Sequence, residues 1–141
     1  MAGIKITPAD RWFSLCVRES ANWTCEYCGT KYEEKAQGLH ASHYYGRGNY
    51  SLRFCPDNVF AHCFSCHLKL GSNPNDFVVW VRDKIGDGAI DILIEKRNDL
   101  NLAKFIKKDL KSVAAHYKAE YGKLRQQREE GATGKLEFTE Y

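Results

Sequence analysis

Near the N-terminus, apolar residues recur every three or four positions. Such spacing is typical of the buried face of an amphipathic helix. The face consists of Trp12, Phe13, Cys16 and Val17. The preceding Thr7-Pro8-Ala9-Asp10 combines a hydroxyl N-cap, a proline at the first helical position and an acid in the first turn. We therefore expect a helix that begins directly after Thr7.

Three further helical patterns occupy the second half of the chain. One starts at Pro74 and runs to about Ile85, and a short one covers residues 89–97. Between about residues 101 and 129 the apolar spacing stays helical throughout, which predicts one long helix. Its apolar stripe consists of Leu102, Phe105, Ile106, Leu110, Val113, Ala114, Tyr117, Tyr121 and Leu124.

The segment between the first helix and Pro74 has the pattern of short strands and turns. Residues 39–45 favour a strand, residues 46–49 form a glycine-containing loop, and residues 50–54 favour a second short strand. Asp57-Asn58 then predicts the N-cap of a helix that continues to about Leu70. Together these patterns predict an α+β protein that is mostly helical.

The composition is that of a globular protein. Of the 141 residues, 43% are hydrophobic and 13% aromatic, which is too many for a disordered chain. No apolar run approaches the ~20 residues that a membrane span needs, and the N-terminus lacks the apolar region of a signal peptide. We therefore expect a cytoplasmic protein with no membrane partner.

Positive charge is concentrated in the predicted C-terminal helix. The chain has a net charge of +3, yet residues 101–128 hold eight cations against two acids, which leaves −3 for the remainder. A cationic stripe attracts polyanions such as DNA, but a solvated helix face shows the same pattern. Charge alone leaves both interpretations open.

Four of the six cysteines form two Cys-x-x-Cys pairs, Cys25/Cys28 and Cys63/Cys66, with 34 residues between them. Two intervening residues let one turn of backbone present both thiolates to one ion, and two such pairs complete a tetrahedral zinc site. Reduced cytosolic thiols disfavour disulfides, and a redox motif would need a βαβ context. We predict structural Zn²⁺, with His62 as a minor competing ligand.

Three histidines and one asparagine lie within or just after this spacer. His40 and His43 belong to the first predicted strand, Asn58 opens the next helix, and His67 follows the fourth zinc cysteine. Taken singly, each has an ordinary structural explanation, such as an N-cap for Asn58. Their order is nevertheless typical of an HNH nuclease: a strand ending in histidine, a loop, Asp-Asn at a helix start, and then Cys-x-x-Cys-His.

Over about residues 10–85 the chain resembles the phage NinG/Rap recombination endonucleases. The resemblance rests on Leu39-His40-Ala41-Ser42-His43-Tyr44-Tyr45-Gly46-Arg47-Gly48, Leu52-Arg53-Phe54, Asp57-Asn58 and Cys63-Phe64-Ser65-Cys66. It implies a ββα-metal (HNH) core with a four-cysteine zinc site, flanked by an N-terminal helix and C-terminal helices. For a phage-encoded protein it also implies the host cell cytoplasm.

The resemblance implies roles for individual residues. His43 corresponds to the general base, and Asn58 to the middle residue of the motif, which holds that histidine in position. His67 corresponds to the last position, a ligand of the catalytic metal. The residues that correspond to structural zinc ligands are Cys25, Cys28, Cys63 and Cys66.

One position departs from the family pattern. Many HNH enzymes have Asp or His directly before the general base as a second metal ligand, where this chain has Ser42. A hydroxyl is a poorer Mg²⁺ ligand than a carboxylate. His40 shares a strand face with Ser42 and is our candidate substitute. The expected chemistry is hydrolysis of a phosphodiester, with His43 accepting a proton from water and one Mg²⁺ or Mn²⁺ neutralising developing charge.

In such an enzyme, cations near the motif can pair with DNA phosphates. The basic C-terminal helix then also becomes a better candidate for DNA binding. Packing explains the tyrosine equally well, and solvation remains an alternative for each cation. The candidate DNA-binding residues are Tyr44, Arg47, Arg53, Lys69, Lys104, Lys108 and Lys111.

Our leading hypothesis is a metal-dependent DNA endonuclease acting on branched recombination intermediates such as D-loops or Holliday junctions. We expect a zinc-stabilised nuclease domain over residues 1–86, a helical extension over 87–130 with its basic helix at about 101–129, and a flexible tail over 131–141. Branch resolution usually needs two symmetric cuts, which suggests a homodimer, with the long helix as a possible interface. The alternatives are a nicking or sequence-directed HNH endonuclease on duplex DNA, and a non-catalytic zinc-stabilised DNA-binding module.

Overall fold

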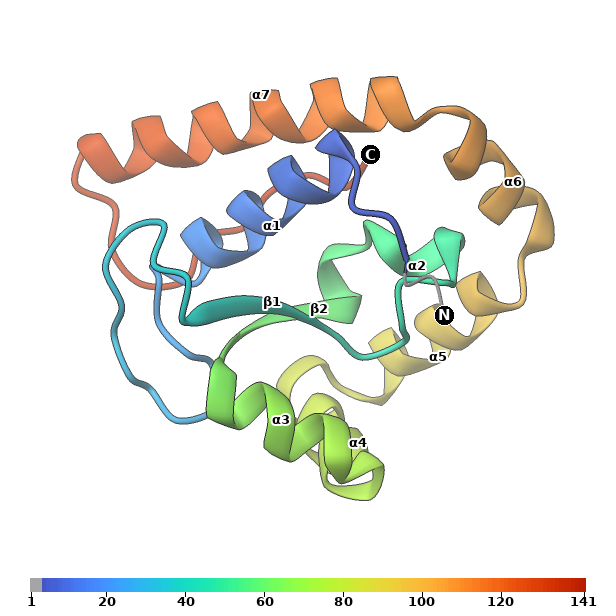
Figure 1. Ribbon diagram of the computed structural model, residues 1–141, viewed down its shortest axis with the longest axis horizontal. Helices are drawn as coiled ribbons and strands as arrows, with labels where there is room; N and C mark the ends of the chain where they lie inside the picture. The colour runs from blue at the N-terminus through green and yellow to red at the C-terminus, as the bar shows by residue number, and fades with distance from the viewer. Residues whose placement is uncertain (1–3) are drawn as a thin grey trace.

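A computed structural model describes residues 4–141 (Figure 1). Over these residues the chain forms seven α-helices, one 3₁₀ turn and a two-stranded antiparallel sheet, which confirms a mostly helical α+β fold. The elements are α1 (Pro8–Ser20), β1 (Leu39–His43), α2 (Tyr50–Arg53), the 3₁₀ turn η1 (Pro56–Asn58), β2 (Val59–Cys63), α3 (Phe64–Ser72), α4 (Pro74–Ile85), α5 (Asp87–Arg97), α6 (Leu100–Lys108) and α7 (Leu110–Glu129).

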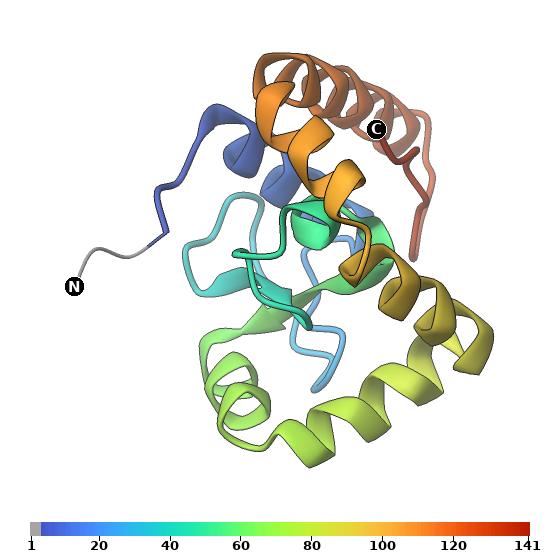
Figure 2. The same cartoon turned by 90° about the vertical axis from the view of Figure 1, so that its right-hand side faces the viewer.

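The sheet lies at the centre of the molecule, with α1 and α7 on one side and α3 and α4 on the other (Figure 1). Figure 2 shows α4, α5 and α6 following one another along the edge of the molecule, from α3 up to α7. No helix in the described part of the chain is long and apolar enough to span a membrane.

Helix α1 begins where the sequence predicts. The Thr7 side chain accepts a hydrogen bond from the Asp10 amide, and the Asp10 carboxylate accepts one from the Thr7 amide at 2.8 Å. This reciprocal capping box satisfies two backbone donors that a helix start otherwise leaves unpaired. Phe13, Cys16 and Val17 are buried, as the apolar spacing predicts.

The segment around the sheet differs from the prediction in two places. Residues 50–53 form the short helix α2 rather than a strand, and residues 59–63 form strand β2 where we expected a continuous helix. Strand β2 pairs with β1, with Val59 opposite His43 and Cys63 opposite Leu39. Every residue of β2 is buried, so it lacks the polar–apolar alternation of a half-exposed strand. Periodicity alone cannot separate such a run from a buried helix.

The predicted long C-terminal helix is divided into α6 and α7 at Asp109. The bend lets α6 pack against α2 while α7 runs along α1. The Asp109 carboxylate accepts a hydrogen bond from the Tyr141 hydroxyl, which holds the end of the chain at the bend. The apolar face of α7 is therefore covered by α1 of the same chain.

Residues 131–141 lack regular secondary structure but are not the loose tail that we expected. The Leu136 amide donates to the Ser20 carbonyl at 2.9 Å, and the Thr139 amide donates to the Glu120 carboxylate at 2.6 Å. The Phe138 ring packs against Phe13 at a centroid distance of 6.0 Å. The tail thus closes the core formed by α1 and α7.

One large hydrophobic cluster combines residues from both of the segments that the sequence separates at residue 86. It includes Phe13 and Val17 from α1, Leu39 from β1, and Val113 and Leu124 from α7. A smaller cluster joins β2, α3, α4 and α5. The predicted nuclease domain and its helical extension therefore share a core.

Arg53 is buried, which corrects the expectation that it contacts DNA. The side chain is 1% exposed, with its Nε 2.9 Å from one Asp10 carboxylate oxygen and a terminal nitrogen 2.7 Å from the other. The same guanidinium donates to the Lys5 carbonyl at 2.8 Å. Arg53 therefore ties α2 to the start of α1 and is unavailable to a phosphate.

We expect Arg53→Met to lower the free energy of unfolding by about 3–5 kcal/mol, because it leaves the Asp10 carboxylate buried without a charged partner. Burial opposes ionisation of Asp10, but the hydrogen bonds from Arg53 and Thr7 bring its pKa below the ordinary value. The contribution of this pair is therefore complete above about pH 4 and is lost as the pH falls further.

Urea unfolding at neutral pH measures this effect. Arg82→Met is the matched control, because the Arg82–Asp87 pair is exposed and should contribute about 0–1 kcal/mol. Equal destabilisation by the two substitutions would show that the buried pair has no special importance.

Candidate functional site

The four predicted zinc ligands lie together where the loop after α1 meets β2 and α3. Their Sγ atoms are all within 4.8 Å of one another, and those of Cys28 and Cys63 are 3.9 Å apart. A tetrahedral site with Zn–S bonds of about 2.3 Å places its sulfur atoms about 3.8 Å apart. The arrangement therefore fits one structural Zn²⁺ bound by four cysteines.

The first cysteine pair lies in a tight turn. Thr24 and Lys31 form a β-bridge, and the Gly29 amide donates to the Cys25 carbonyl at 2.9 Å. Gly29 has a φ of +78°, a conformation that favours glycine. Hydrogen bonds from the Thr30 hydroxyl and amide lower the pKa of Cys28 to about 6, which favours the thiolate that zinc requires.

His62 is not part of the cysteine cluster. It lies on β2 with 0% exposure, among the rings of Phe60, Phe77 and Trp80 at centroid distances of 6.1, 6.0 and 4.9 Å. Both of its ring nitrogens are buried without a hydrogen-bond partner in the described structure. Burial lowers the pKa of His62 to about 4, so the ring is neutral at physiological pH.

We expect His62 to make the fold sensitive to mild acid. Histidine in the unfolded chain has a pKa of about 6.5. Between that value and about 4 the unfolded state binds a proton that the folded state excludes, so stability falls as the pH drops through this range. For His62 the loss at pH 5 should be about 2 kcal/mol relative to pH 7.5.

Urea unfolding of wild type and His62→Phe at both pH values isolates this contribution. The variant places an apolar ring among Phe60, Phe77 and Trp80. It keeps Glu26, His67 and Lys84, the titratable groups that act on His62. Zinc loss in acid affects both proteins alike, so the smaller pH dependence of the variant measures His62. An identical pH dependence would contradict the prediction.

The three histidines of the predicted motif line one cavity of about 630 Å³ between α1, β1 and α3. His40 and His43 come from β1 and His67 from α3. The rings of His40 and His67 are 5.5 Å apart between centroids. Ser42 is buried, with 2% exposure, and does not line the cavity in the described structure. The strand thus presents His40, rather than Ser42, beside His67.

The hydrogen bond of His43 determines which ring nitrogen carries the proton. Its Nε2 lies 2.9 Å from the Arg53 carbonyl oxygen, which can only accept. Nε2 is therefore protonated in the neutral ring, and Nδ1 retains its lone pair. Burial lowers the pKa of His43 to about 4, although the same hydrogen bond acts in the opposite direction. At neutral pH the ring can act as a proton acceptor.

Asn58 is completely buried and fastens the loop between the strands. Its side-chain amide donates to the carbonyls of Tyr45 at 2.9 Å and Leu52 at 3.1 Å, and its side-chain oxygen accepts from the Tyr45 amide at 2.8 Å. Leu52 directly precedes Arg53, the carbonyl of which binds His43. Asn58 therefore acts on His43 indirectly, by fixing the backbone that orients it.

His67 has a buried ring nitrogen that is available to bind a metal ion. Its Nδ1 is buried without a hydrogen-bond partner among the described residues, and burial lowers the pKa of the ring. It directly follows Cys66 of the cysteine cluster on α3, so this cluster fixes its position. The imidazoles of His40 and His67 are a donor set that suits a divalent transition metal.

Four cations also line the histidine cavity: Arg11 and Arg18 on α1, Lys35 before β1, and Arg47 after it. None of them forms an ion pair with a carboxylate within residues 4–141. The acid of the lining, Asp10, is already paired with Arg53. The cavity is therefore suited to an anion.

Of these four cations, Arg47 is a DNA-binding candidate of the sequence, whereas Arg11, Arg18 and Lys35 are not. Arg11 and Arg18 belong to no recognisable motif, and β1 follows α1 by many residues along the chain. Arg11 and Arg18 are seven residues apart, which places both on one face of the helix. This spacing is the sequence signal that could have identified them.

The remaining candidates for DNA binding lie apart from this cavity. Tyr44 packs against Phe77 at 5.3 Å, which favours the packing interpretation, and the Lys69 ammonium lies 5.1 Å from the centre of the Tyr27 ring. Lys104 and Lys108 on α6 and Lys111 on α7 are exposed, and the cavity lining within residues 4–141 does not include them.

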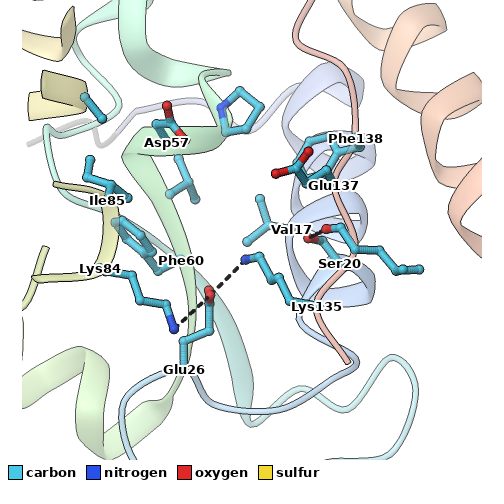
Figure 3. Close-up of a pocket in the computed structure, with 14 residues that line it drawn as sticks. Val17, Ser20, Glu26, Asp57, Phe60, Lys84, Ile85, Lys135, Glu137 and Phe138 are labelled. Atoms are coloured by element: carbon cyan, nitrogen blue, oxygen red, sulfur yellow. Dashed lines mark hydrogen bonds and ion pairs between the residues drawn. The ribbon is translucent and has the colours of Figure 1, made fainter. Parts of the chain in front are cut away.

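A second cavity, of about 400 Å³, lies between α1, β2, α4 and the C-terminal tail (Figure 3). Glu26, which lies between Cys25 and Cys28, points into it. Its carboxylate pairs with Lys135 at 2.8 Å and Lys84 at 3.9 Å. The lining residues, all in the described part of the chain, include no histidine or cysteine. At this cavity the C-terminal tail is therefore attached to the turn that contains Cys25 and Cys28. The cavity is separate from the one that contains the histidines.

Comparison with known protein families identifies the family of the chain. A family model described as Bacteriophage Lambda NinG protein matches residues 7–129, a range that includes the cysteine cluster, the three histidines of the cavity and all of α7. Neither the curated proteins nor the solved structures contain a significant match to the chain.

Proposed function

Because the chain belongs to the NinG family of phage proteins, we propose that it is a metal-dependent DNA endonuclease of the HNH type. The observation that carries the proposal is the histidine cavity. A neutral His43 with a free Nδ1 lies in the same cavity as the His40/His67 pair, and the surrounding cations have no carboxylate partners. A proton acceptor, candidate metal ligands and an anion-binding surface thus occupy one place.

The order of elements supports the same proposal. β1 ends at His43, β2 returns antiparallel to it, and α3 follows with His67. This is the strand–strand–helix order of the ββα-metal superfamily that the sequence resembles. The four-cysteine cluster joins the end of β2 to α3 and fixes the helix relative to the sheet.

The proposed reaction is hydrolysis of a phosphodiester. His43, neutral at pH 7, accepts a proton from water at Nδ1, while Nε2 stays bonded to the Arg53 carbonyl. His40 and His67 would hold a divalent metal, which when bound stabilises negative charge on the reacting phosphate and the leaving oxygen. The unpaired cations of the cavity hold the anionic strand in place.

The donor set affects the choice of metal. Mg²⁺ prefers oxygen ligands, whereas imidazole suits transition metals. With Ser42 buried and His40 beside His67, the site lacks the carboxylate that many HNH enzymes place next to the general base. We therefore expect Mn²⁺ to support faster cleavage than Mg²⁺.

Branched recombination intermediates are the proposed substrates, on the basis of the family resemblance. The test is cleavage of matched linear duplex, D-loop and four-way junction DNA with Mg²⁺ or Mn²⁺. Preferential cutting of the branched substrates supports the proposal, and equal cutting of linear duplex would support the alternative of a nicking or sequence-directed HNH enzyme. Binding without cutting under every metal condition would leave a non-catalytic zinc module.

A homodimer remains part of the proposal, because symmetric resolution of a branch needs two cuts. The interface expected from the sequence is unavailable, since Val113, Tyr117 and Leu124 of α7 are buried in the chain's own core. Sedimentation with and without a four-way junction tests the dimer. A monomeric mass in both samples would contradict it.

A further inference from the structure

We infer that the outer face of α1 is a phosphate-binding ledge, formed by Arg11, Ser14 and Arg18 and extended by Lys35, which holds one DNA strand beside the histidine site. This inference rests on the proposed nuclease function. The ledge residues are not among the DNA-binding candidates of the sequence, which include Lys104, Lys108 and Lys111 of the C-terminal helices.

The ledge residues follow the helical repeat. Arg11, Ser14 and Arg18 are three and four positions apart, and all three line the cavity that contains His40, His43 and His67. Arg11 and Arg18 are separated by about 10 Å along the helix axis at 1.5 Å per residue. Phosphates of one B-DNA strand advance by about 3.4 Å each along the duplex axis, so this separation covers three nucleotides.

The ledge combines exposed side chains with the half-buried Ser14 and Arg18. Arg11 and Lys35 are exposed, and neither pairs with a carboxylate in the described part of the chain. Arg18 donates from Nε to the Ser14 carbonyl at 3.2 Å and lies 5.0 Å from the centre of the Trp23 ring. These contacts hold its guanidinium in position and leave the two terminal nitrogens without a hydrogen-bond acceptor within residues 4–141.

The opposite face of α1 is held firmly by α7. The Cys16 thiol lies 3.2 Å from the Tyr117 carbonyl, and the Phe13 and Tyr117 rings are 4.8 Å apart. Glu19, on the same helix as the ledge, pairs with Arg125 at 2.9 Å. The basic α7 therefore supports α1, and a rigid support keeps the ledge cations at a fixed distance from the catalytic histidines.

The test compares two double variants that remove equal charge, Arg11→Gln/Arg18→Gln from the ledge and Lys104→Gln/Lys108→Gln from α6. Fluorescence anisotropy measures their binding to labelled duplex and four-way junction DNA over a range of NaCl concentrations, without Mg²⁺ or Mn²⁺. We expect the ledge variant to bind about tenfold or more weakly. The slope of log affinity against log salt should fall by about 2, because two phosphate contacts are lost.

Two further proteins separate charge from folding. Arg11→Lys/Arg18→Lys keeps both charges and should retain the wild-type salt slope. Arg11→Gln/Lys35→Gln changes two exposed side chains that form no hydrogen bond or ion pair in the described structure. A weakened, less salt-dependent complex with this second pair supports the ledge even if substitution of Arg18 disturbs Trp23. Circular dichroism verifies that each variant is folded.

The outcomes distinguish this inference from the proposed function. If the wild type binds and cuts DNA while the ledge and α6 variants bind equally well, the ledge is wrong and the nuclease proposal stands. The ledge is also wrong if the α6 variant alone loses affinity. If the wild type neither binds nor cuts any DNA tested, the proposed function fails and the ledge fails with it.

Discussion

Replacing His43 by alanine is expected to lower the rate of DNA cleavage by about 10²–10⁴-fold, the usual contribution of a general base. His43 is suited to this role because its Nε2 is bonded to the Arg53 carbonyl, which leaves the lone pair on Nδ1. Burial lowers its pKa to about 4, so the ring is neutral throughout the neutral range. The measurement is the single-turnover rate on a four-way junction with saturating Mn²⁺. DNA affinity should be unchanged, since the cations of the cavity remain.

His116→Ala is the matched control. His116 also bonds a backbone carbonyl through Nε2, that of Thr139 at 2.6 Å, but it lies on α7 and outside the histidine cavity lining within residues 4–141. Added imidazole should partly restore cleavage by His43→Ala and have no effect on the control. Wild-type cleavage by a folded His43→Ala protein would exclude His43 as the general base.

The four-cysteine cluster was predictable because each Cys-x-x-Cys pair is a local signal. Two residues between cysteines limit how the thiols can be arranged, and the structure brings both pairs within 4.8 Å. The start of α1 was predictable for the same reason, because Thr7 and Asp10 cap it through contacts three residues apart. Features fixed by neighbouring residues are visible in the sequence.

Features that depend on distant partners were missed. Strand β2 has a fully buried pattern that also suits a helix, and its identity depends on pairing with β1 across the intervening loop. Arg53 has the appearance of a phosphate ligand until Asp10, 43 residues away, is seen to pair with it. The ledge on α1 is likewise recognisable only because the histidines of β1 and α3 line the same cavity.

Removal of zinc is expected to abolish the folded state. The sheet has two strands in the described structure, and such a hairpin is marginally stable by itself. The cysteine cluster holds the loop after α1, the end of β2 and the start of α3, and three of its members belong to the main hydrophobic core. Structural zinc contributes about 10–16 kcal/mol in small zinc domains, as much as the ~5–15 kcal/mol by which a typical protein is stable.

Cys25→Ala and Cys55→Ala provide the matched comparison, because both thiols are buried and Cys55 lies outside the metal cluster. We expect Cys25→Ala to lose zinc and cooperative thermal unfolding, and Cys55→Ala to retain both with a loss of about 1 kcal/mol. A chelator should reproduce the first result in the wild type, seen as loss of helical circular dichroism. Metal-free protein that keeps its helices and unfolds cooperatively would show that the packing of α1 on α7 suffices for the fold. The cysteine site would then serve to position His67 rather than to stabilise the chain.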